Sequence, residues 1–306
     1  MQTTKSSYQT GENSKPRQRR RRDQRAENPP RMVETERVCE IVKAVYEYRV
    51  MTQGQIQRLF FGVNPGARSR AARTLAKMFD NHYLERHFLP TRGGLQNSTA
   101  IYSLGHRGAE ALRIQYGIEP KWYASSRDLR NEFLEHSIAI SEVRLAVELA
   151  CRSHGYGLRW TGETEIKSSG YDRVSLKGHK EPAAILPDGY FVVSGTPQGT
   201  THFMLELDRA TEQNSRFKTK IEAYIEYHRG GKYEARYGTR SLRVLTVTLG
   251  ERRLANLKAT TEAAGGENRF WFALLSDIQR PDTDILVAPV WQIAQRSGLH
   301  SLFPQG

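Results

Sequence analysis

Three carboxylates in one short stretch of the chain, Asp188, Glu206 and Asp208, have the chemical type and the spacing of a metal site. Two extended segments flank the polar turn 194–201, and a hairpin centred on Pro197 places Asp188 opposite Glu206. Directly opposed residues project from the same face of a sheet, and Asp208, two residues further on, projects there as well. Carboxylates this close repel each other unless a cation neutralises them or they take up protons.

The opposite face of the hairpin carries only apolar side chains, and we expect it to face the core. Clustered carboxylates without thiolates suit a hard, oxygen-seeking ion. The expected cofactor is therefore Mg²⁺ or Mn²⁺, bound by Asp188, Glu206 and Asp208. The apolar residues of the opposite face are Phe191, Val193, Phe203, Leu205 and Leu207.

The segments around this hairpin alternate between strand and helix patterns, which is typical of an α/β domain. A long helix comes first, and its apolar residues from Phe133 to Leu149 are spread around much of its surface, so we expect it to be buried on several sides. Further helices are predicted at about 214–229 and 251–263, and strands at 158–166, 184–193, 202–208, 242–249, 270–275 and 284–290.

The motifs of this region resemble a known nuclease fold. Pro187-Asp188-Gly189 followed by Glu206-Leu207-Asp208 is similar to the PD-(D/E)XK nuclease core, whose helix-strand-strand-strand-helix-strand order fits the predicted elements. The stretch from Leu205 to Glu212, with the later Lys220-Ile221-Glu222-Ala223-Tyr224, resembles the bacterial replication-relaxation family. That family pairs a winged helix with this fold and includes the MobC-type relaxases of mobilisable plasmids. The resemblance covers roughly residues 35 to 295.

The resemblance implies roles for individual residues. Asp188 and Glu206 would bind the metal, with the Leu207 carbonyl as a further ligand. Glu142, on the long helix, matches in order the acidic residue that such nucleases often supply from their first helix; an ordinary surface glutamate is the equal alternative. The implied reaction is metal-assisted hydrolysis of a phosphodiester.

The sequence departs from the nuclease pattern at Asp208, where most such enzymes have a catalytic lysine. A lysine on the following helix can take its place. Lys220 is our choice because it flanks the apolar side of that helix one turn before Tyr224, and Lys218, on the other edge, is the runner-up. The lysine would position or deprotonate the attacking water and stabilise developing charge.

The N-terminal third has the pattern of a winged helix-turn-helix. Helices are predicted from about residue 33, from Thr52 and over 67–81, followed by extended stretches at 84–89 and 99–104 and a closing helix. We expect the third helix to enter a DNA major groove; a solvated helix surface is the alternative. The predicted DNA contacts are Arg70, Arg73 and Lys77 on one face of that helix and Arg92 in the Gly-rich wing.

The net charge of +13 favours polyanionic partners. Residues 1–31 carry nine Lys or Arg and three Asp or Glu, which accounts for +6, and their polar composition predicts a disordered basic tail. Such a tail either aids solubility or binds phosphates. The predicted organisation is a tail over 1–31, a winged helix over 32–118, a linker over 119–130 and the nuclease-like α/β domain over 131–306.

Other signals narrow the class of protein. No apolar run approaches the ~20 residues of a membrane span, and no secretory signal is present. Cys39 and Cys151 are far apart in apolar patterns, which indicates core thiols in a reducing cytoplasm. The nine histidines include no His-x-His pair, and we expect His136 to pack in the core or at an interface.

The leading hypothesis is a cytoplasmic DNA nickase that acts at a plasmid transfer or replication origin, on duplex or single-stranded DNA. A homodimer and relaxosome or coupling-protein partners are compatible with this role. The rival is a winged-helix regulator with a catalytically inactive nuclease-like domain. A phage-defence nuclease shares the same features.

Overall fold

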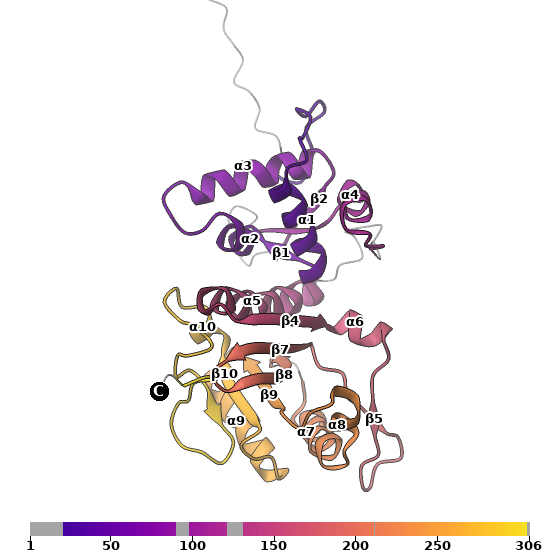
Figure 1. Ribbon diagram of the computed structural model, residues 1–306, viewed down its shortest axis with the longest axis vertical. Coiled ribbons are helices and arrows are strands. Elements are labelled where there is room, and N and C mark those ends of the chain that lie inside the picture. Colours follow the sequence, from indigo (N-terminus) through magenta and orange to yellow (C-terminus); the bar gives the residue numbers. More distant parts are fainter. Residues whose placement is uncertain (1–20, 90–97, 121–130, 211, 305–306) are drawn as a thin grey trace, which may run out of the picture.

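The computed structural model describes residues 21–89, 98–120, 131–210 and 212–304 (Figure 1). Its N-terminal part contains a small antiparallel sheet of order β1-β3-β2, covered by helices whose apolar sides meet in one core. The elements are α1 (Glu36–Tyr48), β1 (Met51–Thr52), α2 (Gln53–Phe60), α3 (Ala67–Asp80), β2 (Leu84–Phe88), β3 (Ala100–Leu104) and α4 (His106–Tyr116).

The helix starts follow the local sequence. The Thr52 side chain accepts a hydrogen bond from the amide of Gln55, and the Gln55 side chain accepts one from the amide of Thr52, which completes the capping box expected at α2. Thr35 caps α1 through the amide of Val38. Helix α3 begins after Gly66, whose φ of 82° is a left-handed conformation that favours glycine.

The remainder of the chain forms a mixed α/β structure around a six-stranded sheet of order β11-β10-β9-β8-β7-β4. Strand β8 runs parallel to β9, and β9 runs parallel to β10, whereas the other neighbours are antiparallel. The sheet strands are β4 (Gly157–Gly162), β7 (Gly189–Thr196), β8 (Gly199–Asp208), β9 (Arg243–Thr248), β10 (Phe270–Leu274) and β11 (Gln292–Ile293). A separate two-stranded sheet joins β5 (Arg173–Val174) and β6 (Ala183–Ala184). The helices are α5 (Asn131–His154), α6 (Glu163–Ser168), α7 (Asn214–Arg229), α8 (Lys232–Tyr237), α9 (Glu251–Ala263) and α10 (Leu275–Ile278).

Helix α5 lies between the N-terminal elements and the large sheet (Figure 1). Val143 and Val147 pack into the core of the sheet, whereas Leu145 belongs to the core of the N-terminal part. Burial on opposite sides explains why the apolar residues of this helix follow no single stripe.

The hairpin of β7 and β8 has the predicted register. Gly189 pairs with Leu205 and Phe191 with Phe203. Asp188 lies just outside this register, because its amide donates at 2.9 Å to the carbonyl of Leu205, the residue that pairs with Gly189. A register shift after Val193 makes the turn tighter than the predicted 194–201, so β7 extends to Thr196. Three predicted strands differ. Strand β4 ends at Gly162 and gives way to α6, residues 284–290 form turns, and the strand predicted over 184–193 is divided into the end of β6 and the start of β7 at Gly189.

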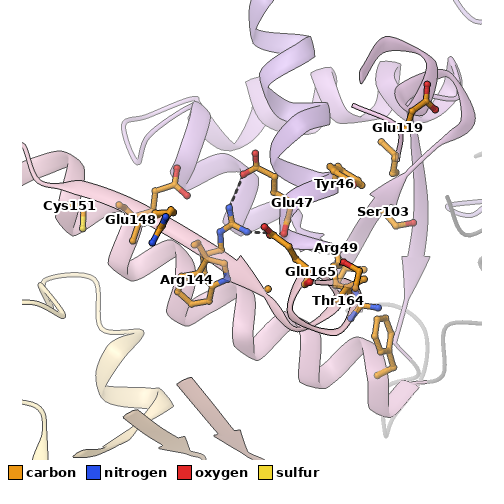
Figure 2. A pocket seen from close by; sticks show the side chains of 18 of the residues that line it. Tyr46, Glu47, Arg49, Ser103, Glu119, Arg144, Glu148, Cys151, Thr164 and Glu165 are labelled. Atoms are coloured by element: carbon orange, nitrogen blue, oxygen red, sulfur yellow. Dashed lines mark hydrogen bonds and ion pairs between the residues drawn. The ribbon is translucent and has the colours of Figure 1, made fainter. Parts of the chain in front are cut away.

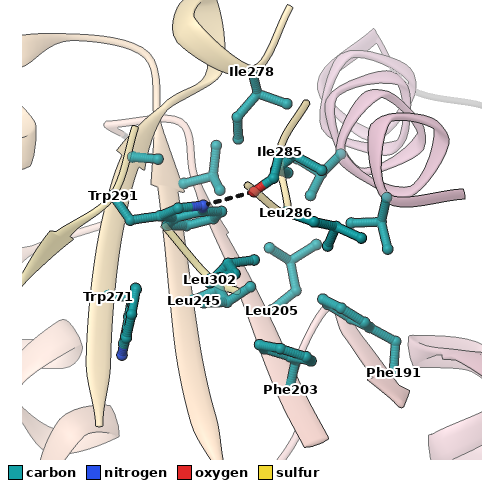
Figure 3. Close-up of a cluster of buried hydrophobic side chains, with 14 of the residues drawn as sticks. Phe191, Phe203, Leu205, Leu245, Trp271, Ile278, Ile285, Leu286, Trp291 and Leu302 are labelled. Atoms are coloured by element: carbon teal, nitrogen blue, oxygen red, sulfur yellow. Dashed lines mark hydrogen bonds between the residues drawn. The ribbon is translucent and has the colours of Figure 1, made fainter. Parts of the chain in front are cut away.

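The two faces of this hairpin are both buried, whereas the sequence predicts burial of the apolar face alone. The apolar face meets α5 and the C-terminal segment, where the Trp291 indole donates to the carbonyl of Ile285 at 3.2 Å (Figure 3). The other face contributes Tyr190 and Met204 to a second core, formed with α7. The second core encloses the carboxylates of β8, so any site there is partly closed from solvent.

Residues 21–31, which we predicted as part of the tail, make contacts with α3 and β2. Arg25 forms an ion pair with Glu85 at 2.6 Å, and its guanidinium lies 4.1 Å from the centre of the Phe79 ring. Ion pairing and ring stacking therefore order a polar segment that buries little apolar surface of its own.

Residues 21–304, apart from the gaps at 90–97, 121–130 and 211, contain no helix that is both long and apolar enough to span a bilayer.

Arg25 provides a test of the ordered segment. Arg25→Ala should lower the free energy of unfolding by about 1–2 kcal/mol, because it removes an ion pair and a ring contact of a largely buried guanidinium. Arg21→Ala is the matched control, since the Arg21 side chain is 80% exposed and its partner Asp23 is exposed too. Equal unfolding midpoints of the two variants in urea would show that the segment does not contribute to stability.

Candidate active site

Both carboxylate oxygens of Asp188 take part in hydrogen bonds. One oxygen accepts the backbone amide of Leu207 at 2.7 Å, and the other lies 3.0 Å from Nε2 of His136 on α5. The following residue must be glycine, because a Cβ atom at Gly189 would lie 2.7 Å from the Trp160 ring. The Pro-Asp-Gly motif thus combines an anchored carboxylate with the close approach of an aromatic ring.

Glu206 points to α7 and is 4% exposed. Nζ of Lys220 lies 2.8 Å from its Oε2, and the hydroxyl of Tyr224 donates to its Oε1. Burial raises the pKa of Glu206 to about 7, with the charge of Asp188 adding to the effect and Lys220 opposing it. For Lys220, burial favours the neutral amine, but Glu206 outweighs it and raises the pKa above its usual value. The lysine therefore keeps its proton.

Lys220 and Tyr224, the two residues of the predicted Lys-x-x-x-Tyr motif, thus both contact the carboxylate of Glu206. Lys218 lies apart from the site: its side chain is 54% exposed and its Nζ lies 3.7 Å from Glu222. Tyr224 is buried, and burial together with Glu206 raises the pKa of its hydroxyl well above the usual range. A tyrosine in this state is a poor covalent nucleophile.

Asp208 lies two residues beyond Glu206 but has its own cation. Arg253 of α9 binds it through two hydrogen bonds, Nη2 to Oδ1 at 2.8 Å and Nε to Oδ2 at 2.9 Å. Burial favours the protonated acid, but the bonds from Arg253 and from the amide of Ala210 outweigh it and lower the pKa of Asp208. The two oxygens are therefore occupied by the protein, and Asp208 acts as half of a buried ion pair.

The carboxylates could hold only a metal ion that takes few ligands from the protein. Within the residues that the structure describes, no group of three or more His, Cys, Asp or Glu is arranged to hold an ion. Mg²⁺, however, keeps several waters and commonly takes one or two carboxylates together with substrate phosphates. The local charge leaves room for one further positive charge, because four carboxylates meet three permanent cations: Asp188, Glu206, Asp208 and Glu212 against Lys220, Arg216 and Arg253.

Glu142 lies away from these carboxylates. It is buried against α2, where Arg58 binds it at 2.5 Å and the Gln55 side chain donates to it at 2.9 Å. The residue of α5 that reaches the site is His136, which we expected to be a packing residue. The sequence could have indicated this role. His136 precedes Ala139 and Val143 at spacings of three and four and therefore shares their helix face towards the sheet, whereas Glu142 does not.

Arg70, Arg73 and Lys77 are exposed on α3, opposite its buried residues. Arg70 donates to Asn64 at 2.7 Å, so the start of this basic face is tied to the preceding loop. Arg92 falls within 90–97, outside the described residues.

A cavity of about 750 Å³ lies elsewhere, between α1 and β3 on one side and α5, β4 and α6 on the other. Arg144 and Glu47 both line this cavity and form an ion pair of 2.8 Å (Figure 2). None of the site carboxylates lines this cavity.

Comparison with protein families matches residues 42–242 to the replication-relaxation family. The match covers most of the chain, including the N-terminal helices and the β7–β8 hairpin with its carboxylates, and the chain belongs to this family. Membership implies a role in plasmid replication or mobilisation and an interaction with DNA. No curated protein and no solved structure gives a significant match.

The Asp208–Arg253 pair generates a prediction about stability. Arg253→Ala leaves a carboxylate that is 5% exposed without its cation, so the free energy of unfolding should fall by about 3–5 kcal/mol. Arg252→Ala, at the exposed neighbouring position of α9, is the matched control and should change it little. Similar urea midpoints for the two variants would refute a structural role for this ion pair.

Proposed function

We propose that this chain is a DNA-binding, metal-dependent endonuclease that nicks DNA at a plasmid transfer or replication origin. The observation that carries the proposal is the convergence of three residues at the open end of one hairpin: Asp188 just before β7, Glu206 on β8 and Lys220 on α7. Coulombic coupling of Asp188 to both Glu206 and Lys220 is consistent with a single cluster.

The topology around the site supports a PD-(D/E)XK-like nuclease. Elements α5, β4, β7, β8, α7 and β9 follow one another, apart from short insertions, in the helix-strand-strand-strand-helix-strand order of that fold. Their strands are neighbours in the sheet, with β9 parallel to β8. Asp188 directly precedes the second of these strands, and Glu206 lies near the end of the third.

Each residue would have a separate task. Asp188 and Glu206 would bind a divalent cation, which when bound polarises the phosphate and lowers the pKa of water. Lys220, whose Nζ lies 2.8 Å from Glu206, would hold its proton and stabilise negative charge on the phosphate. Tyr224 would fix the other oxygen of Glu206. The Asp208–Arg253 pair would fasten β8 to α9 and keep this frame rigid.

The N-terminal part supports DNA binding by a winged helix. Its order of helix, strand, two helices and two strands, with a three-stranded antiparallel sheet, is that of the winged helix-turn-helix. Helix α3 takes the place of the recognition helix, and its exposed cations would contact phosphates or bases.

One observation favours the rival, a regulator with an inactive nuclease-like domain. Lys220 and Tyr224 each bind one oxygen of Glu206, which is only 4% exposed, so a metal there would have to share this carboxylate with both contacts. The nicking assay below separates the two functions.

Asp188→Asn tests the enzyme. With Mg²⁺ or Mn²⁺, wild-type protein should nick supercoiled origin plasmid, and the variant should lose at least about 100-fold in rate, because a lost metal ligand removes several kcal/mol of transition-state stabilisation. Asp282→Asn, in an exposed loop, is the control and should be as active as wild type. Lys220→Ala should be inactive and Lys218→Ala active. A wild-type protein that binds origin DNA but cleaves nothing with either ion would leave the regulator as the function.

The basic face of α3 is tested separately, without cleavage. Arg73→Ala/Lys77→Ala should leave folding unchanged and flatten the slope of log affinity against log salt by about two, one for each lost phosphate contact. Arg229→Ala/Arg280→Ala removes the same charge from exposed positions of the other part and should keep the wild-type slope. Equal slopes for the two double variants would mean that another surface contacts the DNA.

A further inference from the structure

We propose that His136 is a positioning residue for Asp188, which aims this carboxylate at the metal and thereby sets the rate of the nuclease. This inference rests on the proposed function. It assigns a role to a side chain of α5 that the nuclease motifs of the sequence do not include.

The geometry at Asp188 carries the inference. Its two oxygens have partners on different elements: Oδ2 accepts from the Leu207 amide at 2.7 Å, and Oδ1 lies 3.0 Å from His136 Nε2. The amide belongs to the sheet and cannot move independently, so His136 is the contact that fixes the rotation of the carboxylate about its remaining bond. A carboxylate accepts about four hydrogen bonds or metal contacts, so both oxygens keep a lone pair for an ion.

His136 is itself held in place. It lies one turn into α5, on the stripe that continues through buried Ala139 and Val143 towards the sheet. Next to it, Arg209 of the loop after β8 donates to the side chain of Glu135 and to the carbonyl of Glu132. These contacts tie the first turns of α5 to the loop that directly follows the site strand.

The same helix is anchored to the DNA-binding part six residues further on. Glu142 accepts hydrogen bonds from Gln55 and Arg58 of α2, and it is 6% exposed. At 1.5 Å of rise per residue, this contact and His136 are separated by only about 9 Å along the helix axis. The residue that orients Asp188 therefore sits on the element that joins the site to the predicted DNA-reading helices.

The test compares three variants in the full chain. His136→Phe keeps a ring and removes the donor, whereas His136→Gln keeps an N–H donor. His154→Phe is the matched control, because His154 lies at the other end of α5 and makes a similar contact of 2.7 Å with Asp284, far along the chain from the site motifs. The rate of plasmid nicking is measured against Mn²⁺ concentration, and DNA affinity is measured in EDTA.

We expect His136→Phe to lower the nicking rate about 10- to 100-fold and to require more Mn²⁺, as is typical when the partner of a metal-binding carboxylate is lost. DNA affinity should be unchanged, His136→Gln should recover part of the rate, and His154→Phe should nick at nearly the wild-type rate. The proposal is overturned if His136→Phe nicks as fast as wild type with the same Mn²⁺ dependence, or if glutamine is no better than phenylalanine.

The experiment distinguishes a failure of the proposed function from a failure of the role of His136. If wild type nicks, Asp188→Asn does not, and His136→Phe is fully active, the proposed function stands and the role of His136 is rejected. If wild type does not nick under any of these conditions, both are rejected.

Discussion

The burial of the β7–β8 hairpin on both faces is the constraint on which the site depends. A carboxylate on such a strand cannot face water, so each one must meet a cation or a hydrogen-bond donor from a neighbouring element. Glu206 meets Lys220 and Tyr224 of α7, Asp208 meets Arg253 of α9, and Asp188, at the strand start, meets His136 of α5. The carboxylates thereby fix how three helices sit on the sheet.

This constraint also accounts for the departure from the usual nuclease motif. An aspartate at position 208 on a buried face needs a cation of its own, and Arg253 supplies it. In the proposed nuclease site, the lysine would come instead from α7, whose Phe217 and Ile221 are buried and orient Lys220 towards Glu206. The proposed site lacks a lysine at position 208 on the strand, but Lys220 on α7 supplies one. A nuclease-like site of this kind is therefore compatible with the structure.

Much of this was predictable from patterns that are local or strictly periodic. The turn centred on Pro197 predicts the register of β7 and β8, and the place of Lys220 beside the apolar side of its helix favours it over Lys218, the runner-up. The sequence does not reveal contacts between residues that lie far apart along the chain. Arg253 is 45 residues from Asp208, and Arg25 orders a polar segment through a ring on α3. Glu142 was chosen by its order in the chain, whereas the face of the helix decides which residue reaches the site.

The central claim is that Asp188 and Glu206 together bind the divalent ion of a hydrolytic site. Anomalous scattering from a crystal of the wild-type protein soaked in Mn²⁺ tests it most directly, with an Asp188→Asn crystal as the control. The account predicts one strong peak between the carboxylates of Asp188 and Glu206, with Lys220 beside it, and no peak there in the variant. A peak bound by other residues, or none at Mn²⁺ concentrations that support nicking, would contradict the account.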